Sequence, residues 1–219
     1  YTVEGTLVKG WEYHSNESYA YGPIWHTAFS GKDYILVPQQ NGKIKIVERS
    51  GKDRLSIKNK LPANNNEIHL KLGSNLSKSY LSSIDTGGVI SKIYLNDKIE
   101  KININEINAE TAYGLIKNNY VFTKNNLLNV FNEDKASIFE IELENTISEI
   151  PLFFKMTDNT HRIGIVSNHE IYLFNMKGEL DEGFPLIGST PFSIADINND
   201  KTINLVVGDG NMIYTYNLE

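Results

Sequence analysis

The sequence predicts an all-β protein, a five-bladed β-propeller that is closed by its N-terminal strand. Three observations predict this architecture. Short apolar strands separated by turn residues fill the chain, groups of such strands recur every 40 to 45 residues, and the first residues supply a strand that the last group lacks. Four strands per group at this spacing are typical of propeller blades.

The strands appear as apolar residues that alternate or form runs of four to six, without the long periodic pattern of amphipathic helices. Segment 33–58 is an example: residues 35–37 form a buried strand, Asn41-Gly42 turns the chain, and Ser50-Gly51 turns it again after the return strand. Asn-Gly between two apolar runs is a strong hairpin signal. The segment therefore predicts three antiparallel strands.

The same order of strands and turns recurs four more times. Its second strands centre on Leu36, Leu81, Val121, Ile165 and Val206. In the later copies the first turns are predicted at Thr86 to Gly88, Asn125-Asn126, Asn168-His169 and Asp209-Gly210.

A further apolar strand precedes each group and is expected to line the central channel. These innermost strands are predicted at 23–29, 67–72, 110–116, 148–156 and 190–196. The chain is thus expected to form one domain, 1–219, with blades at 14–60, 61–106, 107–146, 147–187, and 188–219 together with 1–13.

The closure of the ring is predicted from the two ends of the chain. The fifth group stops at Glu219 without a fourth strand, and GTLVKGW (5–11) matches GELDEGF (178–184), which leads into the fourth strand of the preceding blade. A first strand that completes the last blade leaves no open edge between them. The alternative is a larger propeller in which the terminal strands belong to different blades. Because the sequence begins at Tyr1 without methionine, we interpret it as a processed or excised chain.

Composition excludes several functional classes. The net charge of −6 argues against nucleic-acid binding, which needs clustered lysine and arginine. No apolar run approaches the roughly 20 residues that span a bilayer, so membrane insertion is not expected. The absence of cysteine rules out disulfides, thiolate metal sites and cysteine nucleophiles. We expect a monomeric domain.

The last 42 residues, GELDEGFPLIGSTPFSIADINNDKTINLVVGDGNMIYTYNLE (178–219), resemble quinoprotein-like and integrin-type FG-GAP propeller repeats. The shared features are the Gly-x-x-x-x-Gly-Phe-Pro segment, the Ala-Asp-x-[Asn/Asp]-x-Asp segment, an apolar strand ending in glycine, and a glycine turn. The match is fair over 148–178 and only architectural before that. Such families include scaffolds, adhesion modules and quinone dehydrogenases, so the resemblance implies a fold more than an activity. No quinone cofactor is predicted.

The resemblance implies a calcium loop after the first strand of the fifth blade. Asp196, Asn198, Asp200 and Asn204 occupy the positions that supply oxygen ligands to Ca²⁺ in FG-GAP-type loops. Lys201 replaces the usual glycine and Asn204 replaces an acidic ligand, so weak binding is expected. The alternative is a turn in which these oxygens accept backbone N–H groups. Asp158 belongs to a related, metal-free copy.

The connection 11–25, WEYHSNESYAYGPIW, is the predicted ligand-binding loop. Aromatic side chains with polar edges suit carbohydrate stacking or a protein hot spot. The alternative is that the two tryptophans, Trp11 and Trp25, pack between blades. The predicted ligand-binding residues are Tyr13, His14, Tyr19, Tyr21 and Trp25.

These features predict a non-catalytic binding or scaffolding domain of a secreted or periplasmic bacterial protein, which presents a face of loops to a protein or glycan. The alternative is a propeller glycoside hydrolase or lyase with carboxylates at the channel mouth, one of them with a raised pKa. The scattered candidates are Glu67, Asp85, Glu110 and Asp158.

Overall fold

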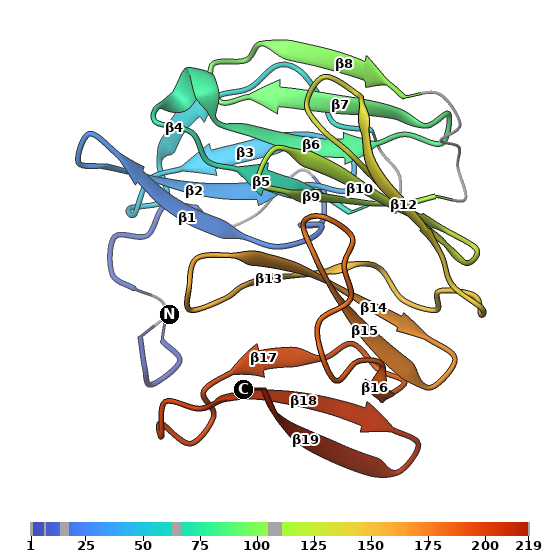
Figure 1. The fold of residues 1–219 in the computed structure, drawn as a ribbon. Helices are drawn as coiled ribbons and strands as arrows, with labels where there is room; N and C mark the ends of the chain where they lie inside the picture. The colour runs from blue at the N-terminus through green and yellow to red at the C-terminus, as the bar shows by residue number, and fades with distance from the viewer. Residues whose placement is uncertain (1, 7, 14–17, 63–66, 105–110, 219) are drawn as a thin grey trace. The chain divides into compact units, whose positions relative to one another are not determined.

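The computed structural model describes residues 2–6, 8–13, 18–62, 67–104 and 111–218, and the chain divides into two compact units, Tyr1–Ala109 and Glu110–Glu219 (Figure 1). The described residues contain no α-helix and one turn of 3-10 helix, η1 (Leu76–Lys78). None of the helical structure in these ranges is long and apolar enough to cross a membrane.

The first unit contains two antiparallel four-stranded sheets, each a meander in chain order. The first sheet is formed by β1 (Trp25–Phe29), β2 (Lys32–Pro38), β3 (Ile44–Val47) and β4 (Asp53–Ser56). The second is formed by β5 (His69–Lys71), β6 (Tyr80–Ile84), β7 (Val89–Tyr94) and β8 (Ile99–Asn103).

The second unit contains three such meanders, and the last has three strands. The third sheet is formed by β9 (Ala112–Ile116), β10 (Asn119–Lys124), β11 (Leu127–Phe131) and β12 (Ser137–Glu142). The fourth is formed by β13 (Leu152–Lys155), β14 (His161–Ser167), β15 (Glu170–Asn175) and β16 (Leu186–Ile187). The fifth is formed by β17 (Ser193–Ala195), β18 (Ile203–Asp209) and β19 (Met212–Leu218).

This architecture confirms the predicted all-β class and its five groups of antiparallel strands. The five residues predicted at the centres of second strands lie in β2, β6, β10, β14 and β18. The last predicted turn is shifted by one residue, since Asp209 pairs with Met212 across Gly210-Asn211. This register places Leu205 opposite Tyr216 and keeps the apolar side chains on one face.

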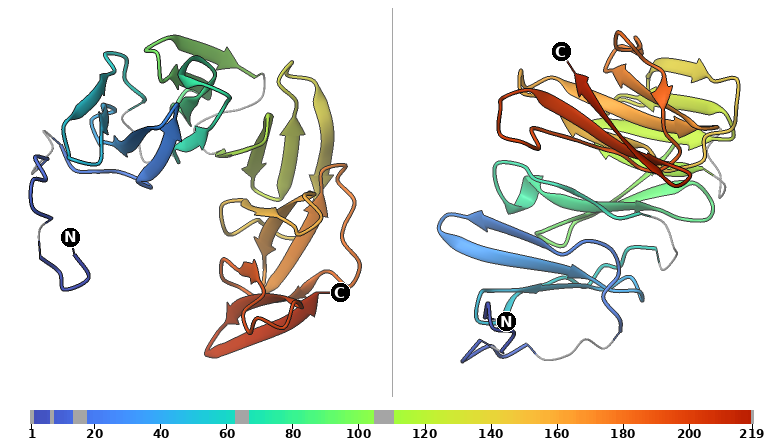
Figure 2. Two further views of the ribbon diagram at one scale, coloured as in Figure 1. Left: turned by 90° about the vertical axis from the view of Figure 1, so that its left-hand side faces the viewer. Right: turned by 90° about the horizontal axis from the view of Figure 1, so that it is seen from below.

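The predicted N-terminal strand is not present in the described part of segment 1–13. Residues 2–6 and 8–11 form turns, and the backbone N–H of Glu12 donates to the carbonyl oxygen of Ser50 at 2.8 Å, within the first unit. The fifth sheet has the order β17-β18-β19, which leaves β19 at an edge, as both views of Figure 2 show. The described fold therefore lacks the expected closing strand.

Apolar side chains between neighbouring sheets form the cores. In the first unit, Leu36 and Ile46 of the first sheet and Leu81 and Ile93 of the second belong to one cluster of buried residues. In the second unit, one cluster joins residues of the third and fourth sheets and another joins residues of the fourth and fifth. Burial of the inward faces in successive sheets explains why the strands read as apolar runs.

Gly164 in β14 allows aromatic rings to approach the sheet closely. A Cβ atom there would lie 2.6 Å from Phe192 and 2.8 Å from Phe154. The rings of Phe154 and Phe192 stack with their centroids 5.2 Å apart. A side chain larger than hydrogen at this position would displace the rings that join the fourth and fifth sheets.

Candidate ligand-binding cavities

A cavity of about 750 Å³ lies in the second unit and is lined by residues of the fourth and fifth sheets. This volume is within the usual range for ligand sites. Its apolar lining includes Leu173, Phe184, Leu186, Ile203 and Leu218, and its charged lining consists of Asp158, Arg162, Asp181 and Glu182. We call it the Arg162 cavity.

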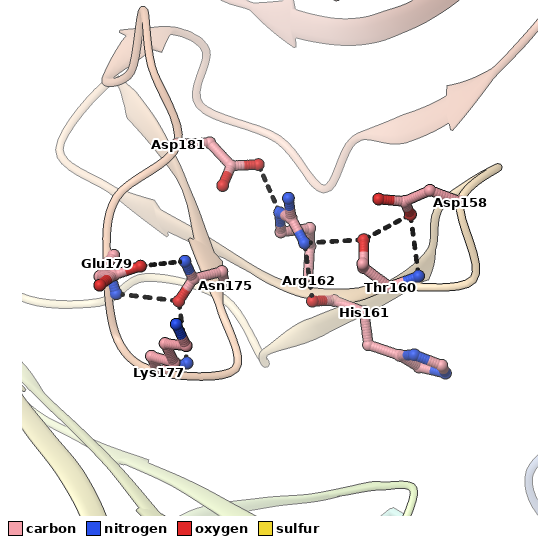
Figure 3. A network of polar contacts seen from close by, with 8 residues as sticks. All are labelled: Asp158, Thr160, His161, Arg162, Asn175, Lys177, Glu179 and Asp181. Atoms are coloured by element: carbon pink, nitrogen blue, oxygen red, sulfur yellow. Dashed lines mark hydrogen bonds and ion pairs between the residues drawn. The ribbon is translucent and has the colours of Figure 1, made fainter.

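Arg162 is the residue around which the polar lining is organised. Its Nε atom donates to a carboxylate oxygen of Asp181 at 2.5 Å, and its Nη1 atom donates to the hydroxyl of Thr160 at 2.9 Å (Figure 3). The Arg162 side chain is 20% exposed and that of Asp181 is 23% exposed, so much of this ion pair is shielded from water. The imidazole ring of His161 points away from Arg162.

Thr160 connects Arg162 to Asp158. One carboxylate oxygen of Asp158 accepts the Thr160 hydroxyl at 2.6 Å and the Thr160 backbone N–H at 2.8 Å. Both hydrogen bonds lower the pKa of Asp158, and the one from the Thr160 hydroxyl has the larger effect. Asp158 therefore remains ionised over the physiological range of pH, and a continuous chain of hydrogen bonds joins it to Asp181.

The turn after β15 positions Asp181. The side-chain oxygen of Asn175 accepts the backbone N–H groups of Lys177 and Glu179 at 2.8 and 3.1 Å, and its amide donates to the Glu179 carboxylate (Figure 3). Beyond the turn, the backbone N–H of Asp181 donates to the carbonyl oxygen of Leu173 at 2.8 Å. A side-chain cap and a backbone hydrogen bond thus fix Asp181 opposite Arg162.

Sequence reasoning missed Arg162, Asp181 and Glu182. Arg162 follows no recognisable motif and is 19 positions from Asp181. The pairing of Arg162 with Asn175 in the β14–β15 register brings Arg162 to the end of the sheet where Asp181 lies. The feature of the sequence that could have indicated this cavity is the adjacent acidic pair Asp181-Glu182 within the GELDEGF segment.

A second cavity, of about 320 Å³, lies in the first unit and is lined by Tyr13. The other lining residues are Gln39, Lys43, Ile44, Lys45, Asp53, Leu55, Ser56, Ile57, Lys58 and Lys60. We call it the Tyr13 cavity. The indole N–H of Trp11 donates to the carbonyl oxygen of Tyr13, and the Lys45 ammonium lies 5.8 Å from the Tyr13 ring centroid.

Of the predicted ligand-binding residues, Tyr13 lines the Tyr13 cavity. Tyr21 and Trp25 are partly buried and pack against the core of the first unit. Tyr19 is 84% exposed, and its carbonyl oxygen accepts the backbone N–H of Gln40 at 2.9 Å. His14 lies outside the described residues.

The predicted calcium loop is organised by hydrogen bonds to its own backbone. The two carboxylate oxygens of Asp196 accept the N–H groups of Asp200 and Lys201 at 3.1 and 2.9 Å, and Asp200 accepts the N–H of Thr202 at 2.7 Å. The hydrogen bond from Thr202 is the largest cause that lowers the pKa of Asp200. Asn198 donates to Asp200 at 2.7 Å.

Asn204, the fourth predicted ligand, is buried and hydrogen-bonded to the loop backbone and to β19. It is 4% exposed, its oxygen faces the N–H of Ile197 at 3.3 Å, and its amide donates to Asn217 at 2.9 Å. No cluster of three or more His, Cys, Asp or Glu residues suited to a metal occurs in the described part of the chain. The loop itself carries the oxygen-bearing side chains of Asp196, Asn198 and Asp200.

The described carboxylates among the predicted catalytic candidates each have their own set of contacts. Burial raises the pKa of Glu67, whose carboxylate lies 3.6 Å from Nε2 of His69. Asp85 accepts the N–H groups of Gly87 and Val89, both at 2.9 Å, and thereby closes its own turn. Asp158 belongs to the Arg162 cavity, and Glu110 lies outside the described residues.

No protein-family model matches the sequence, and no curated protein matches it. Solved structures do match. One is the crystal structure of BBS1N in complex with ARL6DN, with 14% sequence identity, a TM-score of 0.60, and coverage of 84% of this chain and 61% of that one. Another is virginiamycin B lyase from Staphylococcus aureus, with 18% identity, a TM-score of 0.51, and coverage of 89% and 69%.

Both structures are β-propeller-like, and at these identities the likeness shows the fold alone. The chain spans about three fifths of the length of the BBS1 chain. The β-propeller-like architecture is thus established for this chain, whereas the resemblance to FG-GAP and quinoprotein-like repeats stays a prediction.

Proposed function

We propose that this chain is a non-catalytic binding domain of a secreted or periplasmic protein, and that its Arg162 cavity receives a basic side chain of a protein ligand. The observation that carries this proposal is the convergence of three carboxylates and one arginine on a cavity with an apolar wall.

The charges of the cavity favour a cationic ligand. Arg162 is engaged by Asp181 and Thr160, whereas Asp158 and Glu182 add two further carboxylates to the lining. A lysine or arginine side chain combines an aliphatic stem with a cationic end. The stem would lie along the apolar lining and the charged end would meet the carboxylates in charge-assisted hydrogen bonds.

The BBS1 chain supports the class of function by analogy, because it is a propeller-like domain described in complex with another protein. Rigid sheets that carry binding residues on their connecting loops suit recognition without chemistry. Asp158, Thr160 and Asp181 all lie in or beside such connections.

The test is a peptide-binding measurement on the whole chain. A library of immobilised 12-residue peptides selects binders, and each binder is compared with its Lys-to-Gln and Arg-to-Gln form by calorimetry. We expect basic binders whose affinity falls about tenfold in Glu182→Gln, the loss of roughly 1.4 kcal/mol. Glu140→Gln, an exposed change on β12, is the matched control. Binding that is indifferent to both the peptide charge and Glu182 would refute the proposal.

A catalytic role is the second candidate, and the raised pKa of Glu67 is the observation that favours it. Burial raises the pKa of the Glu67 carboxyl, and a carboxyl with a raised pKa suits a general acid in glycoside cleavage. The chain would then release reducing sugars or unsaturated products from a polysaccharide panel, and Glu67→Gln would abolish that release. Activity that is equal in the Glu67→Gln variant would argue against this role.

We also propose that the five sheets are blades of one propeller and that segment 5–11 completes the fifth. The support is local: the turns of residues 2–11 repeat those of residues 175–184. In the first copy the backbone bonds are Thr2 N to Thr6 O (2.7 Å), Gly5 N to Thr2 O (3.0 Å) and Trp11 N to Val8 O (3.1 Å). The second copy has Asn175 N to Glu179 O (2.9 Å), Gly178 N to Asn175 O (3.1 Å) and Phe184 N to Asp181 O (3.3 Å).

The glycines of the two copies agree as well. Gly5 and Gly10 have φ angles of 78° and 83°, and Gly178 and Gly183 have 85° and 84°. These left-handed conformations favour glycine, so the sequence match reflects a shared backbone path. In the fourth sheet this path leads Leu180 to pair with Phe174 of β15, and β19 offers the corresponding edge.

Calcium binding at Asp196, Asn198 and Asp200 is proposed as a weak accessory property. The loop already presents two carboxylates and an amide within five residues. Millimolar calcium is expected to raise the melting temperature slightly, and Asp196→Ala is expected to remove that shift. An equal shift with magnesium, or none with calcium, would leave the loop as a self-capped turn.

A further inference from the structure

The Tyr13 cavity differs in charge from the rest of the chain. The sequence has 27 acidic and 21 basic residues, yet four lysines and one carboxylate line this cavity. The one carboxylate, Asp53, lies 2.6 Å from the ammonium of Lys45. A grouping of like charges around a concave site raises the local concentration of ions of opposite charge.

The walls of this cavity are held in place by backbone contacts. The turn 39–43 is closed by backbone hydrogen bonds from Gln39 N–H to the Lys43 carbonyl oxygen and from Gly42 N–H to the Gln39 carbonyl oxygen, both at 2.9 Å. The backbone N–H of Leu61 donates to the carbonyl oxygen of Gly42 at 2.9 Å. A Cβ atom on Gly42 would lie 2.1 Å from the carbonyl oxygen of Leu61, so the two segments pass in close contact. This contact brings Lys43 and Lys60 to the same cavity.

Tyr13 forms a fixed aromatic wall. The preceding residue bonds to Ser50 through its backbone, and the backbone nitrogen of Tyr13 lies 2.6 Å from the position of a Cβ on Gly51. Burial raises the pKa of the Tyr13 hydroxyl, which therefore stays protonated and able to donate a hydrogen bond. Gln39, 5% exposed, adds a buried amide to the same lining.

We infer that the Tyr13 cavity binds an anionic sugar, a saccharide that carries a carboxylate or sulfate group. Lysine ammonium groups would hold the anionic group, and the Tyr13 ring and Gln39 would contact the sugar hydroxyls and ring face. The volume of about 320 Å³ suits one or two sugar rings and exceeds what an isolated sulfate fills. This site is independent of the Arg162 cavity.

Calorimetric titration of the whole chain tests this inference. The probes are a sulfated uronic-acid disaccharide, the neutral disaccharide lactose, sodium sulfate and a hexaglutamate peptide. We expect the acidic disaccharide to bind, lactose to bind at least tenfold more weakly, and added salt to reduce the affinity. Lys58→Gln with Lys60→Gln is expected to weaken binding about tenfold.

Lys101→Gln, an exposed lysine of β8 in the same unit, is the control and is expected to bind unchanged. Tyr13→Phe separates the hydroxyl from the ring and is expected to cause a smaller loss without loss of fold. Three results would overturn the inference: no binding of the disaccharide, equal binding by sulfate or hexaglutamate, or undiminished binding in the double lysine variant.

Discussion

Asp97 shows how a single side chain connects two sheets of the first unit. One of its carboxylate oxygens accepts the backbone N–H groups of Lys58 and Asn59 at 2.9 and 3.0 Å, and its carbonyl oxygen accepts the Asn59 amide at 2.6 Å. Asn59 follows β4, whereas Asp97 lies in the turn between β7 and β8. The hydrogen bond from the Asn59 backbone is the largest cause that lowers the pKa of Asp97.

Asp97→Asn is expected to lower the melting temperature at pH 7 by about 2–4 °C, the effect of losing roughly 1 kcal/mol in a chain of this size. The lowered pKa means that the carboxylate stabilises the fold above its ordinary pKa of 3.8 and that this stabilisation is lost as the pH falls through the lowered value. Melting curves from pH 7 to pH 2.5 check this. A difference between the two proteins that persists at the lowest pH would contradict it.

The sequence predicts the residues that form turns better than it predicts the residues that line a site. Asn125 and Asn168 adopt φ angles of 53° and 46°, a preference that asparagine carries locally and that the sequence therefore reveals. The roles of Tyr21 and Trp25 depend on which side of a strand faces the core, and both pack inward. Arg162 and Asp181 meet through strand register, which no local pattern encodes.

At the scale of elements, the loop between β17 and β18 carries strain that its sequence does not relieve. Asn199 and Lys201 have φ angles of 60° and 73°, in the left-handed region. Asparagine tolerates this region, whereas other L-residues incur a cost of about 1–2 kcal/mol. Lys201 adopts this left-handed conformation although lysine does not favour it.

Lys201→Gly is therefore expected to stabilise the protein by up to about 1 kcal/mol, since glycine adopts this conformation freely but loses more entropy on folding. Asn199→Gly is the matched control and is expected to change stability little. Urea unfolding with both variants measures the difference. A Lys201→Gly protein that is less stable than the parent would show that the lysine side chain contributes more than its backbone strain costs.

At the scale of the whole molecule, the five repeated meanders follow from the sequence because each is a local unit of strands and turns. Their bounds fall within the ranges expected for the blades. The closing strand differs from the meanders because it depends on pairing between the two ends of the chain. Local sequence patterns do not determine such long-range pairing. β19 has no charged residue from Met212 to Leu218, and Met212 and Ile213 are 60% and 78% exposed. Natural proteins usually cover a strand edge of this kind.

The most direct test of ring closure is a disulfide between the two ends of the chain. In the repeated geometry, Val8 of the N-terminal segment corresponds to Asp181, and Thr215 of β19 corresponds to Leu173 of β15. In the fourth sheet the backbone N–H of Asp181 donates to the carbonyl oxygen of Leu173, so Val8 is expected to lie opposite Thr215 in the closed ring. The chain has no cysteine, so Val8→Cys with Thr215→Cys introduces one defined pair. Val8→Cys with Ile213→Cys, two residues away on the same strand, controls for the register.

Oxidation of the dilute Val8→Cys/Thr215→Cys protein is followed on a non-reducing gel and by its melting temperature. If segment 5–11 pairs with β19, a disulfide is expected to form rapidly within single molecules and to raise the melting temperature, and the control pair is expected to react much more slowly. No disulfide, or disulfides that form between molecules alone, would contradict a ring that segment 5–11 closes on β19.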